Sequence, residues 1–408
     1  MSWSTSTLGS VVKRDGGMIQ TGPFGSQLHQ SDYVSEGIPV IMPKDINGGR
    51  VDPESVALVS EETALRLSRH QLRPRTIVLP RRGEITKRAF IRDEQTGWLC
   101  GTGCLQIVTG ENQLLPEFLY FYMDRQEVGR WLEQHAVGTT MLNLSTKIVA
   151  NLPVKYPSPK IQQRIADILS AYDDLIENNR RRMALLEEAA RQIYREWFVR
   201  LRFPGYEHTR IIDGVPEGWE KSTALSAMEV LSGGTPKTTA PDYWDGDIPF
   251  YTPKDATDSC YVLQTERGIT ELGLKNCNSR LYSVDTIFIS ARGTVGKLNL
   301  ASVPMAMSQS CYALIGRGNV SQYFLFCALK EAIDHFKQHA VGAVFDAIIV
   351  DTFKMIPFIV PTVKIVRAFE ETVIPMFHQI ANLLEQNQKL RNARDLLLPR
   401  LMSGEIAV

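Results

Sequence analysis

Two long stretches of the chain repeat apolar residues at a helical period. Between 161 and 196, alternating steps of four and three residues meet eleven positions, of which eight are apolar. Neither proline nor glycine occurs from 160 to 203, so the stretch predicts one continuous helix with a narrow coiled-coil seam. About 40 residues at about 1.5 Å each would form a rod on the order of 60 Å long.

A second seam lies between 366 and 401, where nine of eleven positions at this spacing are apolar. Pro375 falls inside it, and we expect a kink or an interruption there because proline lacks a backbone donor and clashes with the preceding turn. Two such seams in one chain can bury against each other as an antiparallel coiled coil, and any remaining apolar face can take a partner protein.

Four residues mark the expected seam, namely Asn179, Leu186, Asn387 and Leu390. If the helices are antiparallel, the two asparagines lie close together. A polar seam residue can fix the register of paired helices at a cost in stability. The alternative is that each asparagine faces water.

The regions before the two helices have a mixed pattern. Short apolar runs at 76–79 and 286–289 lie between Gly and Pro signals and predict strands, and helical stretches follow near 116–134 and 322–337. Without sustained βαβ alternation, the fold class is α+β. We therefore expect a first mixed domain at 1–157, a long helix at 158–205, a second mixed domain at 206–361 and a second long helix at 362–408.

The two halves are copies of one unit. The string QHAVG occurs at 134–138 and 338–342, an offset of 338 − 134 = 204, and the same offset pairs Leu152-Pro153 with Ile356-Pro357. Upstream, an offset of 210 superposes Pro-Lys-Asp at 43–45 on 253–255 and Arg-Gly at 82–83 on 292–293. Two constant registers indicate a duplicated domain with its connector, since solenoid repeats have periods of about 20 to 50 residues.

Composition narrows the class of protein. The chain has 408 residues, 45 basic and 45 acidic, and 44% hydrophobic residues, which is typical of a folded globular protein. No signal-peptide pattern and no apolar run of about 18 residues occur, so we expect a cytoplasmic location without a membrane span. The six cysteines form no CxxC pair and are expected to be free thiols.

Positive charge is concentrated locally despite the zero net charge. Nine Arg or Lys residues and one acid lie between Arg66 and Arg92, whereas the matching stretch of the second half is nearly balanced. The halves thus share a frame and differ in what they expose.

Catalytic patterns are weak. GTVGK at 293–297 lacks the first glycine and the final Ser or Thr of a phosphate-binding loop, and the histidines have no metal-ligand spacing. Asp173-Asp174 and Glu187-Glu188 are expected on solvated helix faces. The sequence offers no catalytic residue, no metal site and no cofactor site.

Polar loops that recur in both halves carry the candidate binding chemistry. Lysine or arginine beside glycine suits phosphate contact, because glycine lets the backbone approach, and arginine can read guanine in the major groove. The alternative is ordinary turn chemistry. The candidate DNA contacts are Lys44, Asp45, Arg81, Arg82, Lys87, Arg88, Lys254, Asp255, Arg292 and Lys297.

Several motifs in this order resemble one family. They are GPFGS at 22–26, GVPEGW at 214–219, GGTP at 233–236, a proline four residues before an isoleucine at both helix starts, and LPRLMSGEI at 398–406. Together with the duplication, they resemble the specificity subunits of type I restriction–modification systems (the HsdS family) along essentially the whole chain. Family members usually have a glutamate before the glutamine at the helix start, and here Ile161-Gln162 and Ile365-Val366 differ, which we expect to alter local capping only.

The resemblance implies a function. Each mixed domain would be a target-recognition domain that reads one half of a bipartite, asymmetric site on double-stranded DNA. The helices would set the spacer and bind two methyltransferase subunits, through which the restriction and translocation subunits would join. S-adenosylmethionine would bind to the methyltransferase subunits, and this chain would be non-catalytic. Two readers about 34 Å apart, one helical turn, would leave a spacer of about 6 to 7 base pairs unread.

Two other classes remain open. The chain could be the DNA-recognition portion of a split, fused restriction–methylation enzyme, or a scaffold that binds only proteins, which the balanced net charge slightly favours. Copurification with methyltransferase neighbours and mapping of methylated adenines would distinguish these classes.

Overall fold

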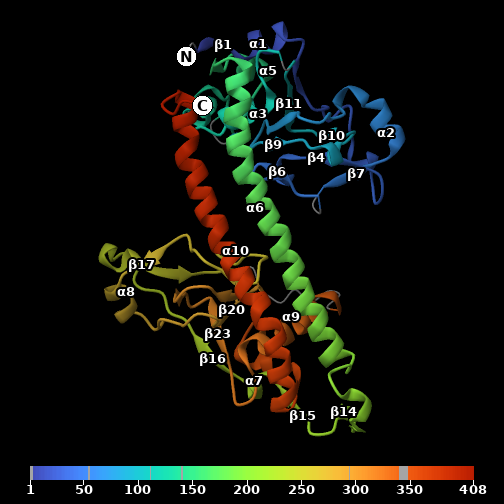
Figure 1. Ribbon diagram of the computed structural model, residues 1–408, viewed down its shortest axis with the longest axis vertical. Coiled ribbons are helices and arrows are strands. Elements are labelled where there is room, and N and C mark those ends of the chain that lie inside the picture. The colour runs from blue at the N-terminus through green and yellow to red at the C-terminus, as the bar shows by residue number, and fades with distance from the viewer. Residues whose placement is uncertain (1–2, 54–55, 111, 139–140, 294, 340–347) are drawn as a thin grey trace. The chain divides into compact units, whose positions relative to one another are not determined.

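The computed structural model describes residues 3–53, 56–110, 112–138, 141–293, 295–339 and 348–408. The chain divides into two compact units, unit 1 (1–174 with 391–408) and unit 2 (175–390). Each unit holds one mixed region and one part of each long helix (Figure 1). These divisions fall inside the helices, whereas our domain boundaries separate the helices from the mixed regions; those boundaries stay a prediction.

Unit 1 contains two four-stranded sheets, with strand orders β2-β11-β8-β9 and β10-β4-β7-β3. In the first sheet, β11 lies antiparallel between β2 and β8. Leu105 and Ile107 on one side of β11 join the core that packs on the helices, and Cys104 on the other side joins a second core. The strands are β1 (Ser4–Thr7), β2 (Met18–Thr21), β3 (Tyr33–Val34), β4 (Ile38–Ile41), β5 (Ile46–Asn47), β6 (Arg50–Val51), β7 (Ala57–Val59), β8 (Ile77–Pro80), β9 (Ala89–Phe90), β10 (Leu99–Cys100), β11 (Cys104–Val108) and β12 (Pro153–Tyr156).

Short helices pack against the two sheets of unit 1. Ser145 caps α5 because its side chain accepts the Ile148 backbone N–H, as expected of serine at this position. The helical stretch expected near 116–134 forms two helices. The short helices are α1 (Leu8–Arg14), α2 (Glu61–Arg66), α3 (Pro116–Tyr122), α4 (Gln126–His135) and α5 (Thr146–Ala150).

Unit 2 repeats this architecture with a five-stranded sheet, β16-β23-β20-β21-β18, and a three-stranded sheet, β19-β17-β22. The stretch expected to be helical near 322–337 is a single helix, α9 (Gln322–His339). The strands are β13 (Ile211–Ile212), β14 (Val215–Pro216), β15 (Glu220–Thr223), β16 (Met228–Ser232), β17 (Trp244–Tyr251), β18 (Tyr261–Val262), β19 (Gly268–Ile269), β20 (Ile287–Ser290), β21 (Leu298–Ala301), β22 (Ala306–Met307), β23 (Cys311–Gly316) and β24 (Pro357–Val360). The other short helices are α7 (Ala224–Ala227) and α8 (Glu271–Lys275).

The strand pairings confirm the duplication. The order β2-β11-β8-β9 corresponds to β16-β23-β20-β21, and the parallel pair β4–β10 corresponds to β17–β22. The terminal pair β1–β12 corresponds to β15–β24. In the second QHAVG string, Gln338 and His339 end α9, while residues 340–342 lie outside the described residues. The α+β prediction is therefore confirmed.

The two long helices are α6 (Pro159–Tyr194), which continues as a π-helical turn at Arg195–Val199, and α10 (Val363–Ser403). The prediction that Pro375 interrupts the second helix is wrong, because α10 is continuous through it. Pro375 is exposed while Val373 and Phe377 are buried. The proline therefore lies on the solvent side of the helix, where water can satisfy a carbonyl that has lost its backbone donor.

The seam of α6 has a different phase from the one we expected. Five of the expected positions are correct, but each intervening one shifts by a single residue. Leu175 is 51% exposed, whereas Ile176 is 5% exposed, and Met183 is buried where Arg182 is exposed. The observed seam of ten positions, with Asn179 as its one polar member, is 165, 169, 172, 176, 179, 183, 186, 190, 193 and 197.

Within unit 2 the two helices run antiparallel. The Asn179 Nδ2 atom donates to Asn387 Oδ1 at 2.9 Å, and further along the pair the rings of Tyr194 and Phe369 lie 6.1 Å apart. Asn387 Nδ2 also donates to the Ile176 carbonyl at 3.2 Å. The expected closeness of the two asparagines is confirmed, and both are buried. Leu186 and Leu390 are half-buried.

Polar contacts attach the helices to each mixed region. In unit 1, the buried Gln162 side chain accepts the Leu115 N–H at 2.8 Å and donates to the carbonyls of Gln113 and Pro157. In unit 2, Glu187 accepts the Cys260 N–H at 2.9 Å and the Ser259 hydroxyl at 3.1 Å. The expectation that Glu187 is solvated is wrong, because this carboxylate anchors α6.

The helix pair inside unit 1 is joined by an ion pair. Arg394 donates to Asp173, and both side chains are only about one-fifth exposed (22% and 21%). Burial acts to lower the pKa of Arg394, but the carboxylates of Asp173 and Asp395 outweigh it and raise that pKa. Asp173 is therefore a partly buried ion-pair partner and not the solvated residue that we expected.

Candidate nucleic-acid interface

Loops meet at one end of the first sheet of unit 1. Because β11 is antiparallel to β2 and β8, the last residues of those two strands lie beside its first. Gly22 N donates to the Cys104 carbonyl at 3.0 Å, and Arg81 N donates to the Gly103 carbonyl at 2.7 Å. The GPFGS loop and the Arg-Arg-Gly loop are therefore held next to each other.

Unit 2 builds the same loop end. Ala291 N donates to the Ser310 carbonyl at 2.8 Å, as Arg81 N does to Gly103. The carbonyl of Ala291 accepts the Ile348 N–H at 2.9 Å, and the carbonyl of Arg81 accepts the Leu144 N–H at 2.8 Å. Both copies thus fix this loop by two equivalent backbone hydrogen bonds.

The Pro-Lys-Asp turns follow β4 and β17. The fully buried Asp45 accepts the Met42 N–H at 2.8 Å. Asp255 accepts the Thr252 N–H at 2.8 Å and the Glu266 N–H at 2.6 Å. In both turns the carboxylate holds the backbone, while Lys44 and Lys254 are exposed. We therefore leave the two aspartates out of the proposed interface and keep the lysines.

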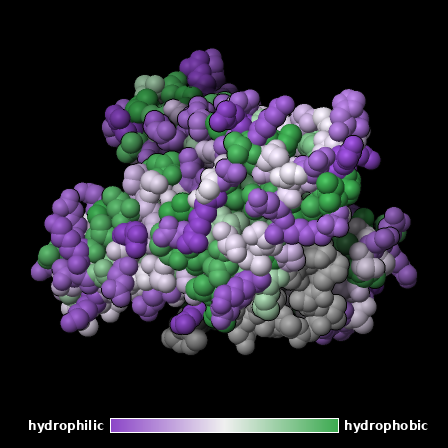
Figure 2. Space-filling model, turned by 90° about the horizontal axis from the view of Figure 1, so that it is seen from below, coloured by the Kyte–Doolittle hydropathy of each residue, from purple (hydrophilic) through white to green (hydrophobic). Residues whose placement is uncertain are grey.

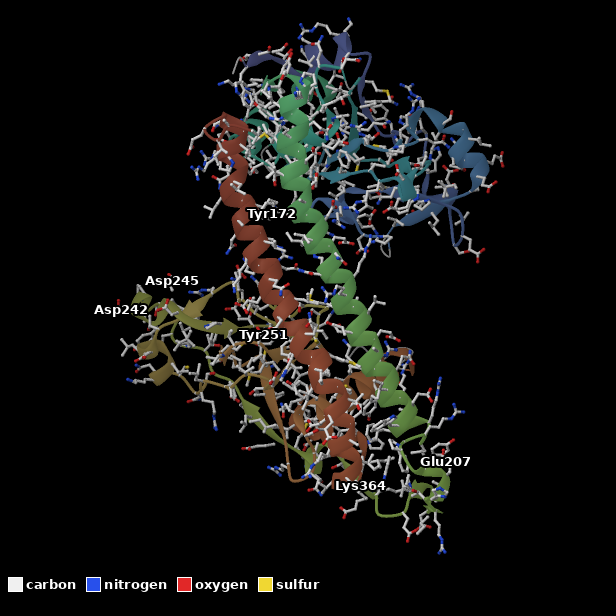
Figure 3. All side chains as sticks on the ribbon, in the orientation of Figure 1. Tyr172, Glu207, Asp242, Asp245, Tyr251 and Lys364 are labelled. Atoms are coloured by element: carbon white, nitrogen blue, oxygen red, sulfur yellow. The ribbon has the colours of Figure 1, made fainter. Side chains whose placement is uncertain are left out.

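Strand β17 leads from the periphery of unit 2 to the Pro-Lys-Asp turn. Asp245 lies at the outer end of the strand and Tyr251 lies deeper in the unit (Figure 3). Tyr251 is fully buried, and its hydroxyl donates to Asn299 Oδ1 at 3.0 Å. Burial raises the pKa of Tyr251 far above its usual range. This fixed strand end positions the turn that displays Lys254.

The Arg-Gly loops place one arginine of each unit in solvent. Arg82 and Arg292 are exposed, and the following glycines have φ of +76° and +77°, a conformation that glycine adopts without strain. The lysines are less available, because Lys87 pairs with Glu84 and Lys297 pairs with Asp258. The Lys297 ammonium lowers the pKa of Asp258.

Arg81 distinguishes unit 1 from unit 2. Its guanidinium lies 5.6 Å from the ring centroid of Phe24, which is itself 54% exposed in the GPFGS loop. Unit 2 has Ala291 at this place. Phe24 is not among the predicted contacts, although it lies inside the GPFGS motif. Its partner Arg81 comes 57 positions later (81 − 24), so no local sequence pattern indicates the pair.

Three buried polar atoms around the Arg81 loop have no hydrogen-bond partner in the described structure, namely Arg81 Nε, Thr102 Oγ1 and Asn143 Oδ1. Thr102 precedes the glycine that holds the Arg81 backbone, and Asn143 forms a bridge with Arg82. Buried polar groups in native proteins are normally paired with protein or water. These loops thus have hydrogen-bonding capacity to spare.

The sequence cluster of positive charge is partly neutralised. Within the described residues, four of its nine members pair with carboxylates, and three of those carboxylates lie outside the window from Arg66 to Arg92. Arg88 is buried, donates to the Tyr120 carbonyl at 2.9 Å and pairs with Asp124. Arg88 is therefore a structural contact of unit 1. The ion pairs are Arg66–Asp32, Arg75–Glu117, Lys87–Glu84 and Arg88–Asp124.

Other chemistry is sparse. Among the described residues, no group of three or more His, Cys, Asp or Glu side chains could hold a metal ion, and no described helix is long and apolar enough to cross a bilayer. All six cysteines are free, and burial raises the pKa of Cys100 to about 12, so this thiol stays protonated at neutral pH. Thr294 of the GTVGK string lies outside the described residues. Seen from one end, the surface intersperses hydrophilic with hydrophobic residues (Figure 2).

Comparison with known proteins agrees with these features. The specificity subunit of the type I restriction enzyme MjaIX from Methanocaldococcus jannaschii is 26% identical over 394 residues, covering 92% of this chain and 88% of that protein. The HindI specificity subunit from Haemophilus influenzae is 23% identical and covers 78% and 83%. The crystal structure of a type I S subunit from M. genitalium shares the fold, with a TM-score of 0.57, 18% identity and coverage of 98% and 96%.

A family model decides the assignment. The model described as the type I restriction modification DNA specificity domain matches residues 2–188 and again 216–391. The two matches correspond to the two copies of the duplicated unit and together span most of the chain. The chain therefore belongs to the type I restriction–modification DNA specificity family.

Proposed function

We propose that each unit reads one half of a bipartite DNA site through the major groove, using its loop end. One observation carries this proposal: both units hold an exposed Arg-Gly loop and a lysine-bearing Pro-Lys-Asp turn on equivalent strands. An exposed arginine can donate two hydrogen bonds to guanine, and an exposed lysine can contact phosphate.

The site is asymmetric in this proposal. Unit 1 presents Arg81 on Phe24 beside Arg82, while unit 2 presents Ala291 beside Arg292. Unit 1 thus has a second arginine in this loop that can read a guanine edge, whereas unit 2 has only Arg292 there. Different side chains on the same backbone frame support two different half-sites.

The helices α6 and α10 set the unread spacer and bind two methyltransferase subunits in this proposal. The buried pair Asn179–Asn387 supports a defined register, because sliding the helices would leave both amides without partners in an apolar seam. Exposed apolar residues on the outer helix faces, Leu185 and Leu396, are available to partner proteins.

The chain supplies recognition and leaves the chemistry to its partners. Specificity subunits are generally non-catalytic. The methyltransferase subunits would bind S-adenosylmethionine and methylate adenine, and the restriction and translocation subunits would join through them. The curated relatives named above are specificity subunits of restriction enzymes, which supports this division of roles.

Genome methylation tests the proposal. The chain is copurified with its neighbouring methyltransferase, and methylated adenines are mapped by long-read sequencing before and after deletion of its gene. We expect a stable assembly and a gapped, asymmetric motif that disappears on deletion. A stable assembly without any lost motif would instead favour a scaffold, and an ungapped motif would contradict two separate readers.

A further inference from the structure

One pocket in unit 1 has a charged lining, and three of its charged residues are replaced by apolar residues in unit 2. It has a volume of about 350 Å³ and is lined by Thr86 and Arg88 from the β8–β9 connection, by Asp124 and Arg125 at the break between α3 and α4, and by residues of α4 that include Arg130 and Glu133. The family match and the loop end described above assign no role to this pocket.

The break between the helices is specific to unit 1. Asp124 and Arg125 correspond to Ala328 and Leu329 (124 + 204 = 328), which are buried inside the continuous helix α9. Arg88 corresponds to Leu298 (88 + 210 = 298), which is also buried. A continuous helix in unit 1 would bury two charges where unit 2 buries methyl groups, so the interruption keeps these charges at the surface.

Two arginines of the pocket have incomplete partners. Arg88 is neutralised by Asp124. Arg125 Nε lies 3.5 Å from Glu127 Oε2 and makes no hydrogen bond within the described structure. Arg130 is exposed, and its Nη2 donates only to the neutral Gln126 Oε1, at 3.1 Å, among the described residues. Both guanidinium groups thus retain donors for an anion.

The position of the pocket indicates which anion it takes. Thr86 follows Arg82 by four residues on the same connection, so the pocket adjoins the loop that we propose to read bases. Protein–DNA interfaces surround base contacts with contacts to phosphate oxygens, for which arginine supplies a planar pair of donors.

We propose that this pocket binds a backbone phosphate of the DNA next to the half-site read by unit 1, and that unit 2 has no equivalent contact. This inference rests on the proposed function. It makes unit 1 the half that anchors DNA electrostatically, and it predicts that the two half-sites respond differently to salt.

The test uses the full chain assembled with its methyltransferase subunits and a duplex that carries the methylated motif, titrated at several salt concentrations. Arg130→Ala is expected to weaken binding about tenfold at fixed salt. It is also expected to reduce the slope of log K against log salt by about 0.9, the share of one phosphate contact. Arg130→Lys keeps the charge and should keep the slope.

A matched control removes a charge from unit 2. Lys330 corresponds to Gln126 (126 + 204 = 330) and lies on α9, so Lys330→Ala should leave the slope unchanged. An unchanged slope in Arg130→Ala, or an equal loss in Lys330→Ala, would overturn the pocket proposal. Loss of methyltransferase subunits from Arg130→Ala would also overturn it, because the pocket would then hold a protein carboxylate.

Neutral phosphate analogues locate the contact. Replacing single phosphates by methylphosphonate should weaken binding of the wild-type chain at one phosphate beside the unit 1 half-site and have no effect there on Arg130→Ala. If wild type and variant lose affinity equally at every position, the pocket proposal fails while the proposed function stands. If the wild-type assembly binds no specific duplex at all, the proposed function itself fails.

Discussion

Units 1 and 2 place opposite charges at the same point of the same backbone. Arg75 and Asp285 are equivalent (75 + 210 = 285), and both have positive φ, 66° and 65°, two residues before a central strand begins. Arg75 forms a two-point ion pair with Glu117 at 2.6 and 2.7 Å, whereas Asp285 accepts the Tyr261 hydroxyl at 2.6 Å. The same backbone conformation can therefore hold a side chain of either charge, provided that each polar group keeps a partner.

The starts of the long helices show the same contrast. Gln162 in unit 1 makes three buried hydrogen bonds, whereas Val366, its equivalent at an offset of 204, is buried among apolar residues of unit 2. The two copies have thus diverged into a polar and an apolar attachment of the long helix, while the expected effect of the unusual residues on local capping stays a prediction.

Exchanging the two attachments should have the largest effect on stability. Gln162→Val leaves the Leu115 N–H and two carbonyls without partners in a buried place, and we expect a loss of about 3 kcal/mol from unit 1. Chemical denaturation and hydrogen exchange at the Leu115 amide would measure it. Val366→Gln, the reverse exchange, should destabilise unit 2 because the amide finds no partners there. If valine is tolerated at 162, the two attachments are equivalent and the contrast is wrong.

The seam offers the next largest effect. Asn387→Ala leaves Asn179 Nδ2 without its partner in a buried seam and removes the additional hydrogen bond to the Ile176 carbonyl, and we expect a loss of about 2 kcal/mol. Changing both asparagines to leucine should restore or raise thermal stability, because a buried apolar pair replaces a buried polar one. A double variant as unstable as the single one would show that the pair stabilises the fold and does not serve the register.

Binding variants compare the two loop ends directly. Arg82→Ala and Arg292→Ala should each weaken specific DNA binding about tenfold, since one good base contact contributes about 1–3 kcal/mol. The loss should disappear when the half-site of that unit is randomised and should remain when the other half-site is randomised. Fluorescence titration at fixed salt would measure both. Losses that do not depend on the half-site would assign these arginines to phosphate.

Acidification should lower the stability of unit 1 more than that of unit 2, and this is the smallest of the four expected effects. Burial, assisted by the nearby Arg69 charge, lowers the pKa of His70 below 6.5, although the Thr21 carbonyl partly opposes this. The unfolded chain then binds a proton that the folded one resists, so the contribution of His70 does not change with pH well above 6.5 and becomes destabilising as the pH drops below that value. Hydrogen exchange of unit 1 amides at pH 7 and pH 5 would show the change, and His70→Gln should remove it.

Much of the architecture could be predicted from the sequence because it depends on repeated, local patterns. The duplication, both long helices and the meeting of Asn179 with Asn387 follow from constant offsets and apolar spacing. The phase of the α6 seam could also have been predicted from the sequence. Shifting alternate positions by one residue replaces Arg182 with Met183 and Glu196 with Trp197, and an apolar seam should have been preferred to one with two charges.

Contacts between distant segments could not be predicted in this way. The basic stretch from Arg66 to Arg92 predicted a local basic surface, but Glu117 and Asp124 approach it from later in the chain and neutralise part of it. In sequence, Asp45 looks like an exposed residue of a polar loop. In the structure it is buried and accepts a backbone N–H of its own turn. Such outcomes depend on which backbone groups the fold brings near a charge, which no local spacing encodes.

The attachment of Glu187 has a practical meaning for building hybrid proteins. Because this α6 carboxylate accepts the Ser259 hydroxyl and the Cys260 backbone N–H, a second half transplanted from a relative would arrive without its anchor if the junction were placed after 187. Crossovers upstream of this glutamate keep donor and acceptor in one parental sequence. Recombination between genes of this kind should therefore yield working new combinations more often when it occurs in the first part of the long helix.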